Sequence, residues 1–455
     1  MRVREFVENF RKRNNRAPRV GFFGFGVTNR ALYKAYLAEG VTDFTLRAHS
    51  EEDYIPFARS YFGESSAREL DEDILFLSPS VRRDACSAVR EAERLGVRVC
   101  SDCELYFETP TPPTLCVTGS DGKSTVTAMT AHILRTAGIA ASPAGNFGIP
   151  FCELSPETEI CVAELSSFNL SYSEPRSCRA AITNITENHL NWHASFEEYC
   201  EAKARVLERT EGAVLSADAP ICLALARGRK PFALYSAQLS FGELSRLAAA
   251  EHYLTQSDGY ILLDGARYVP LPDATARVRH TLLNAMTAAG LTLGYADSEQ
   301  LGEAMRSFKP LPHRAELCHS HRGIDFIDSS IDTTPERTAN TLRGLSRPVL
   351  LLLGGRGKGL SYEPLTEPLV CYARAVALYG EAGGEIEAYL CSHGELDGMA
   401  RVYHRDFDTA LAALCEQARE GDTVLLSPAA TAYGEFRDFA ERGCHFTSYV
   451  KNKFI

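Results

Sequence analysis

The chain has 455 residues, of which 45% are hydrophobic and 24% are charged, and its formal net charge is −11. This length and composition allow several hydrophobic cores and exclude a disordered, collagen-like or disulfide-stapled small protein. The acidic excess argues against a nucleic-acid binder, since such proteins displace counterions with basic side chains.

No run of about 18 apolar residues occurs, so we expect no membrane insertion, and the first residues mix charges instead of forming a signal peptide. The 14 cysteines are spread singly through apolar segments, as at Cys116, Cys161 and Cys371. This pattern is typical of reduced cysteines that serve as small core residues. The one Cys-x-x-Cys pair, Cys100 and Cys103, lacks the second pair that a zinc ribbon needs. We expect a soluble, cytoplasmic protein.

Short apolar runs alternate with segments of helical period along the whole chain. This alternation predicts an α/β fold with β-α-β units, and uninterrupted apolar runs are typical of parallel strands buried on both faces. The predicted strands cover residues 20–24, 73–77, 114–117, 160–163, 180–183, 349–353 and 424–426.

Two proline-rich segments, at 109–113 and 308–314, predict domain boundaries, because proline continues neither a helix nor a central strand. We therefore predict three domains of ordinary size, at 1–108, 109–309 and 310–455.

A phosphate-binding loop is predicted after the strand at 114–117. The residues Gly-Ser-Asp-Gly-Lys-Ser-Thr at 119–125 lead into a helix with Val126, Met129, Ile133 and Leu134 on one face. Glycines let backbone N–H groups approach an anion, and the helix N-terminus favours negative charge. Lys123 would reach the β- and γ-phosphates, and Ser124 or Thr125 would bind Mg²⁺. The motif is shorter than the usual Walker A, whose first glycine is replaced by Val117.

Three further side chains are candidates for a metal site. Glu164 follows a predicted strand, where either a Mg²⁺ ligand or a surface acid can stand. His189 and His193 lie in a loop beside Trp192, the single tryptophan of the chain. Such loop histidines are commonly solvated or hydrogen-bonded rather than ligands.

Lys203 is predicted to lie on the apolar side of a helix. Ser195 to Glu198 reads as a capping box that opens this helix, and Phe196, Tyr199, Lys203 and Val206 or Leu207 share one face. A buried lysine favours the neutral amine, which can add CO₂ to give a metal-binding carbamate. The alternative is a lysine that extends to solvent.

These motifs, in this order, resemble the Mur ligase family of ATP-dependent amide ligases, and most closely its D-glutamate-adding branch. The matching segments are residues 119–125, 145–148, 164–170, 184–190, 202–205, 280–284, 313–314, 354–358, 426–429 and 436–439. The resemblance covers essentially the whole chain. It implies a Rossmann-like N-terminal domain for a UDP-sugar, a central P-loop ATPase-type domain with a parallel sheet for ATP, and a Rossmann-like C-terminal domain for the amino acid.

The resemblance also implies the reaction, in peptidoglycan precursor synthesis. ATP would convert the carboxylate of UDP-N-acetylmuramoyl-L-alanine into an acyl phosphate, which the amine of D-glutamate attacks. Two Mg²⁺ ions would be held by Ser124, Glu164, His189 and carbamylated Lys203, in what we expect to be a monomer.

The residue roles that the resemblance implies fall into three groups. The catalytic residues would be Lys123, His189, Lys203 and Arg314. ATP would bind to Gly119, Ser120, Asp121, Gly122, Lys123, Ser124, Thr125, Asn284, Arg314 and Asp328. The other substrates would bind to Val27, Thr28, Arg47, Ser78, Asn146, Ser167, Thr334, Lys358 and Phe439.

The sequence departs from the family pattern at four positions. Ser330 replaces a common lysine, Ala432 a serine of the glutamate site, Thr281 an asparagine, and Arg47 an acidic residue. The first two leave the choice between D- and L-glutamate open.

Three alternative functions remain. The chain could be a sister ligase, either another Mur ligase or a folylpolyglutamate-type enzyme, or a member that binds without catalysing. A dehydrogenase is suggested only by Gly24-x-Gly26, which lacks the third glycine of the dinucleotide motif, because Asn29 stands there.

Overall fold

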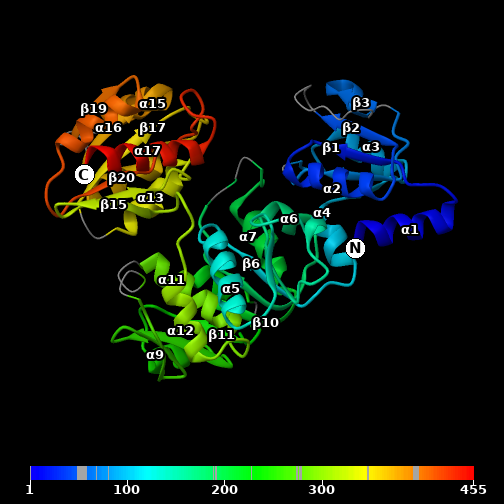
Figure 1. Ribbon diagram of the computed structural model, residues 1–455, viewed down its shortest axis with the longest axis horizontal. Coiled ribbons are helices and arrows are strands. Elements are labelled where there is room, and N and C mark those ends of the chain that lie inside the picture. The colour runs from blue at the N-terminus through cyan, green and yellow to red at the C-terminus, as the bar shows by residue number, and fades with distance from the viewer. Residues whose placement is uncertain are drawn as a thin grey trace. The chain divides into compact units, whose positions relative to one another are not determined.

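The computed structural model describes residues 2–48, 59–67, 69–79, 81–187, 189, 192–226, 228–272, 275, 279–345, 348–392 and 399–454. The chain forms two compact units, Met1–Phe308 and Lys309–Ile455 (Figure 1). The first unit contains two sheets and the second contains one. The α/β class expected from the sequence is confirmed, while the predicted division of the first 309 residues into two domains stays a prediction.

The first sheet has the strand order β3-β2-β1-β4-β5, and every pairing in it is parallel. Its strands are β1 (Val20–Phe23), β2 (Phe44–Ala48), β3 (Arg59–Phe62), β4 (Ile74–Leu77) and β5 (Arg98–Cys100). The associated helices are α1 (Arg2–Asn14), α2 (Val27–Ala38), η1 (Gly63–Ala67), α3 (Ser87–Arg94) and α4 (Asp102–Glu108). The strand order reverses between β1 and β4, which is where open parallel sheets bind ligands.

The second sheet has nine strands in the order β14-β13-β12-β11-β10-β9-β6-β8-β7. They are β6 (Thr114–Thr118), β7 (Ala141–Gly145), β8 (Ile160–Glu164), β9 (Arg176–Ile182), β10 (Arg209–Ser216), β11 (Ala233–Tyr235), β12 (His252–Ser257), β13 (Tyr260–Leu263) and β14 (Ala266–Pro270). The pairings are parallel from β7 to β12 and antiparallel from β12 to β14. The parallel part brings the carboxyl ends of β6, β8 and β9 to one edge.

Helices cover both faces of this sheet. One face carries α5 (Lys123–Thr136), α11 (Arg279–Thr292) and α12 (Ser298–Ser307). The other carries α6 (Ser167–Tyr172), α7 (Phe196–Ala204), α8 (Pro220–Leu225) and α9 (Phe241–Leu247), with the short turns η2 (Phe151–Glu153) and η3 (Arg205–Leu207). Because both faces are covered, central strands have apolar runs in their middle, such as residues 115–117 and 160–163, as the sequence predicted.

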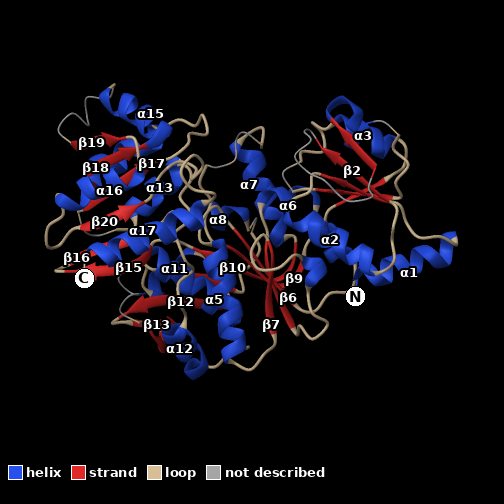
Figure 2. Ribbon diagram, turned by 45° about the horizontal axis from the view of Figure 1, so that its top comes forward, coloured by secondary structure: helices blue, strands red, loops and turns tan. Residues whose placement is uncertain are grey.

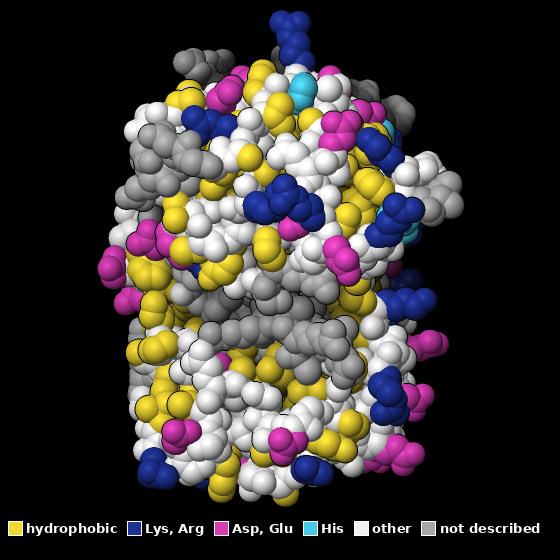
Figure 3. All heavy atoms as spheres, turned by 90° about the vertical axis from the view of Figure 1, so that its left-hand side faces the viewer, with side chains coloured by type: hydrophobic (Ala, Val, Ile, Leu, Met, Phe, Trp, Pro, Cys, Tyr) yellow, Lys and Arg dark blue, Asp and Glu magenta, His cyan; other side chains and the backbone are white. Residues whose placement is uncertain are grey.

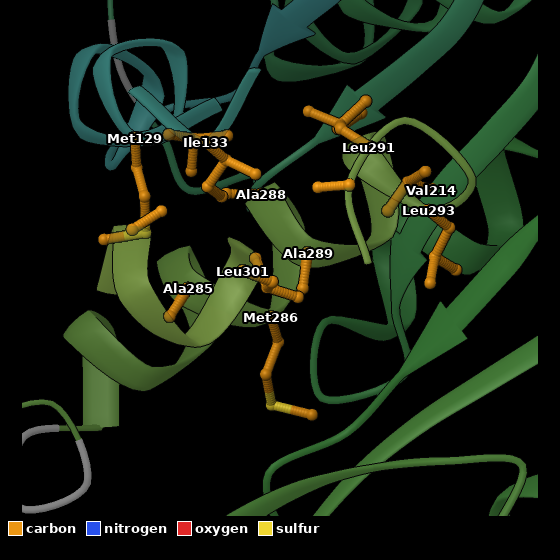
Figure 4. Close-up of a cluster of buried hydrophobic side chains, with 14 of the residues drawn as sticks. Met129, Ile133, Val214, Ala285, Met286, Ala288, Ala289, Leu291, Leu293 and Leu301 are labelled. Carbon is orange, nitrogen blue, oxygen red and sulfur yellow. The ribbon is translucent and has the colours of Figure 1, made fainter. Parts of the chain in front are cut away.

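The contact between α5 and α11 forms the centre of one core. Figure 4 shows Met129 and Ile133 of α5 lying over Ala285, Ala288 and Ala289 of α11. All five side chains are buried. The predicted apolar face of α5 is therefore confirmed, and the alanines let the two helix backbones come close.

The second unit holds a six-stranded sheet in the order β15-β16-β20-β17-β18-β19, parallel except for β15 (Figure 2). Its strands are β15 (Glu316–His321), β16 (Ile324–Asp328), β17 (Val349–Gly354), β18 (Ala373–Tyr379), β19 (Ala400–His404) and β20 (Thr423–Leu426). One core includes α13 (Pro335–Arg343), η4 (Glu363–Leu365), α14 (Thr366–Tyr372) and α15 (Gly380–Cys391), and the other includes α16 (Phe407–Glu416) and α17 (Phe439–Lys453).

The seven predicted strands are all present, with ends that differ from the prediction by a few residues. The expectation for cysteine holds at Cys116 and Cys161, which are buried, but it is wrong at Cys371, whose side chain on α14 is exposed. Among the described helices, none is long and apolar enough to cross a bilayer. The face in Figure 3 carries basic and acidic side chains scattered among hydrophobic ones.

Candidate active site

The phosphate loop lies between β6 and α5. Gly119 and Gly122 have φ angles of +145° and +77°, which L-residues with a side chain rarely adopt. A Cβ on Gly119 would lie 1.9 Å from the Thr183 Oγ1, and one on Gly122 would lie 2.4 Å from the Asn284 Oδ1. Both positions therefore require glycine, and Gly122 directly precedes the N-terminus of α5.

The loop is held by the segment that follows β9. The Ser120 N–H donates to the Asn184 carbonyl at 2.9 Å, and the Asp121 N–H donates to the Asn184 Oδ1 at 2.8 Å. The Thr183 hydroxyl donates to the Asp121 carbonyl at 2.5 Å. On the other side, the Ser120 hydroxyl lies 2.8 Å from the Tyr199 hydroxyl of α7. These contacts fix the loop before any ligand binds.

Two lysine amines meet at one carbonyl of this loop. The Nζ atoms of Lys123 and Lys203 donate to the Gly119 carbonyl at 2.9 and 2.7 Å. Lys203 is only 2% exposed, which confirms that it faces the apolar side of α7, and it lies over the Tyr199 ring. Burial, and next the charge of Lys123, lower the pKa of Lys203 well below its usual value, while Asp121 and Glu164 oppose this shift. The neutral amine is therefore favoured.

Glu164 ends β8, beside β6, and is 1% exposed. Its Oε1 accepts a hydrogen bond from the Asn146 Nδ2 at 2.9 Å, and its Oε2 is buried with no hydrogen-bond partner in the described part of the chain. A buried carboxylate oxygen without a partner is costly unless a cation or donor meets it. Ser124, also buried, begins α5 next to Lys123. These oxygen donors fit a divalent cation such as Mg²⁺.

The turn after β9 places its two histidines differently. His189 is exposed and has a φ of +57°, and its carbonyl accepts hydrogen bonds from the N–H groups of Trp192 and His193 at 2.9 Å each. The His189 ring lies 5.0 Å from the Phe168 ring. His193 is 1% exposed, and its Nε2 lies 2.9 Å from the Ser167 hydroxyl.

The N-terminus of α7 differs in one respect from the predicted capping box. Ser195 caps the helix by accepting from the Glu198 N–H at 3.2 Å. The Glu198 carboxylate, however, accepts from the Ala194 N–H at 2.8 Å, where a capping box would use the N–H of Ser195. The cap thereby includes the last residue of the turn that carries the histidines.

The carboxyl edge of the first sheet carries another group of predicted residues. The Ser78 N–H donates to the Phe23 carbonyl at 2.9 Å, which places Ser78 beside Gly24 between β1 and β4. Val27 and Thr28 begin α2, and Val27 is 79% exposed. These positions suit a ligand at the end of the parallel sheet.

Arg47 occupies a different environment. Its side chain is fully buried, forms an ion pair of 2.7 Å with the equally buried Glu72, and donates to the carbonyls of Ser66 and Glu69. The guanidinium also lies over the Tyr61 ring. Arg47 therefore joins β2 to the segment before β4, and we assign it no contact with substrate.

Asn146, Ser167 and Asn284 also lie around the central site. Asn146 is in the turn after β7 and contacts Glu164, as described above. Ser167 is 2% exposed, so its hydroxyl is available to His193 rather than to solvent. Asn284 projects from α11 toward Gly122 at the start of α5. The side chain of His280, four residues before it, lies outside the described residues.

In the second unit, the buried Asp328 pairs with the partly buried His313. Asp328 ends β16 with no exposed surface, and its Oδ2 lies 2.7 Å from the His313 Nδ1. Burial raises the pKa of Asp328 above its usual value, although His313 opposes this shift. Arg314 follows His313 directly, and the Phe439 ring lies 6.2 Å from the His313 ring. Asp328 thus orients the His313-Arg314 segment instead of facing solvent.

The glycine-rich turn after β17 places Lys358 near the segment before α13. The Lys358 Nζ donates to the Thr333 hydroxyl at 3.0 Å. The adjacent Thr334 Oγ1 is buried without a hydrogen-bond partner in the described part of the unit. Desolvation, followed by the charges of Arg337 and Arg442, lowers the pKa of Lys358.

Arg442 was missed by the sequence analysis. It is fully buried on α17 and donates to the Ser330 hydroxyl at 2.9 Å, the Ser330 carbonyl at 2.9 Å and the Ala430 carbonyl at 3.1 Å. Ser330, where the family commonly has lysine, therefore accepts a hydrogen bond from a cation. Ala432, two residues after Ala430 in the sequence, is also buried, at 5% exposure. The position of Arg442 in the sequence gives no indication that its side chain points into the core.

Two models of protein families match the chain. The Mur ligase middle domain matches residues 117–292, and the Mur ligase glutamate ligase domain matches residues 313–430. The first match contains the phosphate loop, Glu164, His189 and Lys203, and the second contains Asp328 and Lys358.

Several relatives carry the name UDP-N-acetylmuramoylalanine–D-glutamate ligase. The protein of Rubrobacter xylanophilus is 36% identical over 451 residues, which cover 92% of this chain and 95% of the relative. The protein of Symbiobacterium thermophilum is 31% identical over 453 residues, which cover 95% and 98%.

Solved structures show the same fold at lower identity. The UDP-N-acetylmuramate-alanine ligase of Thermotoga maritima has a TM-score of 0.59 at 20% identity, covering 96% of this chain and 100% of that one. The MurF protein of Acinetobacter baumannii has a TM-score of 0.57 at 14% identity, covering 93% and 95%. From the family models and from relatives that are similar over nearly their whole length, the chain belongs to the Mur ligase family.

Proposed function

We propose that this chain is an ATP-dependent ligase that joins D-glutamate to UDP-N-acetylmuramoyl-L-alanine during peptidoglycan precursor synthesis. Relatives that match nearly the whole chain, from Symbiobacterium thermophilum and Rubrobacter xylanophilus, are named as D-glutamate ligases of UDP-N-acetylmuramoylalanine. The observation that supports it best is the convergence of Lys123, Lys203 and the unpartnered Glu164 oxygen around one phosphate loop.

ATP binding follows from the loop geometry. The backbone N–H groups at the start of α5 face the β- and γ-phosphates, and the helix terminus favours their negative charge. The Lys123 Nζ, which donates to two loop carbonyls, would turn to the phosphates. Asn284 would contact the adenine base, and Arg314 is a further candidate for phosphate binding. In a related structure, the MurF ligase of Thermotoga maritima is in complex with ADP.

Glu164 and Ser124 would hold one Mg²⁺, and His189 with a carbamate on Lys203 would hold a second. Bound metal lowers the charge on the transferring phosphoryl group and on the substrate carboxylate. The neutral amine that burial favours at Lys203 is the form that reacts with CO₂. In the chain itself, Gly119 orients this amine through its carbonyl, and Tyr199 covers it from one side.

The nucleotide sugar binds at the carboxyl edge of the first sheet, near Val27, Thr28 and Ser78, and extends toward Asn146 and Ser167. Its carboxylate is converted to an acyl phosphate, which provides phosphate as a leaving group. Glutamate binds in the second unit, where Lys358 and Thr334 meet its carboxylates and Phe439 lines its aliphatic part. The Thr334 hydroxyl, buried without a partner among the described residues, is available for this contact. The neutral amine of glutamate then attacks the acyl carbon and phosphate leaves.

We further propose that the enzyme acts as a cytoplasmic monomer, because its nucleotide-linked substrate is a soluble precursor. The departures at Ser330 and Ala432 bear only on the choice of amino acid. Arg442 supplies positive charge next to Ser330, so a cation remains at the place where the family commonly has lysine.

The test is phosphate release from ATP and Mg²⁺ with UDP-N-acetylmuramoyl-L-alanine and D-glutamate, L-glutamate or neither. Release that requires D-glutamate, with a new amide detected by mass spectrometry, supports the proposal. Release that requires L-glutamate keeps the mechanism but changes the specificity. Absence of release with either isomer, in folded protein that binds ATP, contradicts the proposal.

A further inference from the structure

A single arginine joins the loop that carries Ser78 to the turn that carries His189. Arg82 lies in the loop after β4, where the Val81 N–H donates to the Ser78 carbonyl at 3.0 Å. Its guanidinium donates to the Trp192 carbonyl and lies over the Trp192 ring, 5.6 Å from the centroid. The same guanidinium is 3.6 Å from the Glu198 carboxylate. Arg82 thus contacts three parts of this region: the Trp192 backbone, the Trp192 ring and the Glu198 carboxylate of the adjoining helix cap.

The turn that Arg82 contacts is one hydrogen-bonded unit. The N–H groups of Trp192 and His193 both donate to the His189 carbonyl, so a shift of the Trp192 backbone moves His189. Phe168 packs on the rings of His189 and Trp192, at 5.0 and 4.7 Å. His189 itself has a left-handed backbone, which surrounding contacts must maintain.

Glu198 extends this connection to the buried side of the turn. One of its oxygens lies 3.5 Å from the His193 Nδ1 and 3.6 Å from Arg82, and the other accepts from the Ala194 N–H. His193 in turn contacts the Ser167 hydroxyl through its Nε2. The route from Ser78 to Ser167 therefore runs through direct contacts of Val81, Arg82, Glu198 and His193.

Arg82 can move without disturbing a core. Its side chain is 28% exposed and lines an open cavity of about 430 Å³ together with Trp192, Glu198 and Arg90. Asp84, at 2.7 Å from the Arg82 Nε, offers a second partner on its own loop. The guanidinium can therefore exchange partners when the loop of Ser78 changes position.

We infer that Arg82 is a positioning residue that links occupancy of the UDP-sugar site near Ser78 to the placement of His189. The inference rests on the proposed function, because it takes Ser78 to contact the nucleotide sugar and His189 to bind metal. When the sugar nucleotide fixes the Ser78 loop, Arg82 fixes the Trp192 carbonyl, and the His189 turn is held for metal binding. The two sites are then coupled reciprocally, as linkage requires.

Trp192 provides a direct readout, because it is the only tryptophan of the chain. Titration of the wild-type protein with UDP-N-acetylmuramoyl-L-alanine, without ATP, is expected to change the Trp192 emission. In Arg82→Ala this change is lost, while calorimetry shows that the nucleotide sugar still binds. The half-saturating Mg²⁺ concentration for phosphate release rises about tenfold in the variant, the usual scale for coupled sites, with little change in the KM for ATP. Arg82→Lys keeps the charge but not the planar group. Its Trp192 emission change and its Mg²⁺ requirement are therefore expected to lie between those of the wild type and of Arg82→Ala.

Arg83→Ala is the matched control. Arg83 lies in the same loop, pairs with Glu104 and lies over the Tyr172 ring at 4.4 Å, but among the described residues it makes no direct hydrogen bond or ion pair with the His189 turn. This variant should keep both the Trp192 response and the Mg²⁺ requirement. The inference is overturned if Arg82→Ala keeps them too, or if Arg83→Ala changes them equally. Failure of the wild-type protein to bind the nucleotide sugar or form product would instead reject the proposed function on which the inference rests.

Discussion

Substitution of Gly119 by alanine should weaken nucleotide binding, and the structure allows the size of the loss to be worked out. The new Cβ would lie 1.9 Å from the Thr183 Oγ1 and 3.1 Å from the Asn184 carbonyl, at a φ of +145°. The backbone conformation costs about 1–3 kcal/mol for a residue with a side chain. Turning the Thr183 hydroxyl away also removes the hydrogen bond that its single O–H donates to the Asp121 carbonyl, at about 1 kcal/mol.

The total, about 2–4 kcal/mol, must be supplied whenever the loop takes its phosphate-binding shape. ATP affinity should therefore fall by about 30-fold to about 1,000-fold. Isothermal titration of Mg²⁺ and a non-hydrolysable ATP analogue measures this loss directly. Both lysine amines on the Gly119 carbonyl would be displaced as well, so turnover should fall with affinity.

Gly138→Ala is the control at the opposite end of α5. Gly138 has a φ of +82°, but a Cβ there meets no heavy atom within 4 Å. It should reduce stability by about 1–2 kcal/mol and leave nucleotide affinity unchanged. Gly119→Ala combined with Thr183→Ala removes the closest clash and should recover part of the affinity. Wild-type affinity in Gly119→Ala, or equal losses in both glycine variants, would refute the steric argument.

Three further predictions concern the charged groups. Lys203→Ala should lose ligase activity, and short carboxylates should restore part of it by replacing the carbamate; full activity without an additive contradicts that role. Glu164→Gln should raise the Mg²⁺ concentration needed for turnover by about tenfold or more, since second-shell losses alone reach this scale, while the thermal midpoint stays near wild type. Lys203→Met should stabilise the protein in CO₂-free buffer, because the lowered pKa makes the unfolded chain bind a proton that the folded one releases. Each unit of lowering is worth about 1.4 kcal/mol, and the gain should shrink as the pH rises toward the ordinary lysine pKa. Urea unfolding across this pH range checks the sign, and a gain that grows with pH contradicts it.

The sequence was sufficient to predict the elements whose signal is local. Apolar runs identified the parallel strands, and the glycines and lysine at 119–123 identified a loop between a strand and a helix. The apolar face of α7 predicted the burial of Lys203. Each of these features depends on residues within a few positions of one another, so periodicity and spacing are enough.

Features that depend on distant partners could not be predicted. His193 looked like an ordinary loop histidine, yet it is buried against Ser167, 26 residues earlier. Arg47 looked available to a ligand, but Glu72, from the segment before β4, pairs with it. Arg442 gave no signal because its acceptors are backbone carbonyls and hydroxyls from separate strands and loops. Side-chain chemistry alone does not reveal which of these groups the fold will enclose.

The contact between α5 and α11, which alanines line, also sets the distance between the axes of these two helices. α5 begins at the phosphate loop, and α11 carries Asn284, whose side-chain amide lies against Gly122 of that loop, so the spacing of the two helix axes determines how Asn284 meets the loop. Helix axes lie about 8 Å apart when small residues meet and about 10 Å apart when large ones do. A difference of about 2 Å exceeds the tolerance of a hydrogen bond. Ala285, Ala288 and Ala289 thus set the distance between Asn284 and the phosphate loop. Larger side chains at these three positions would alter nucleotide selection without touching the nucleotide.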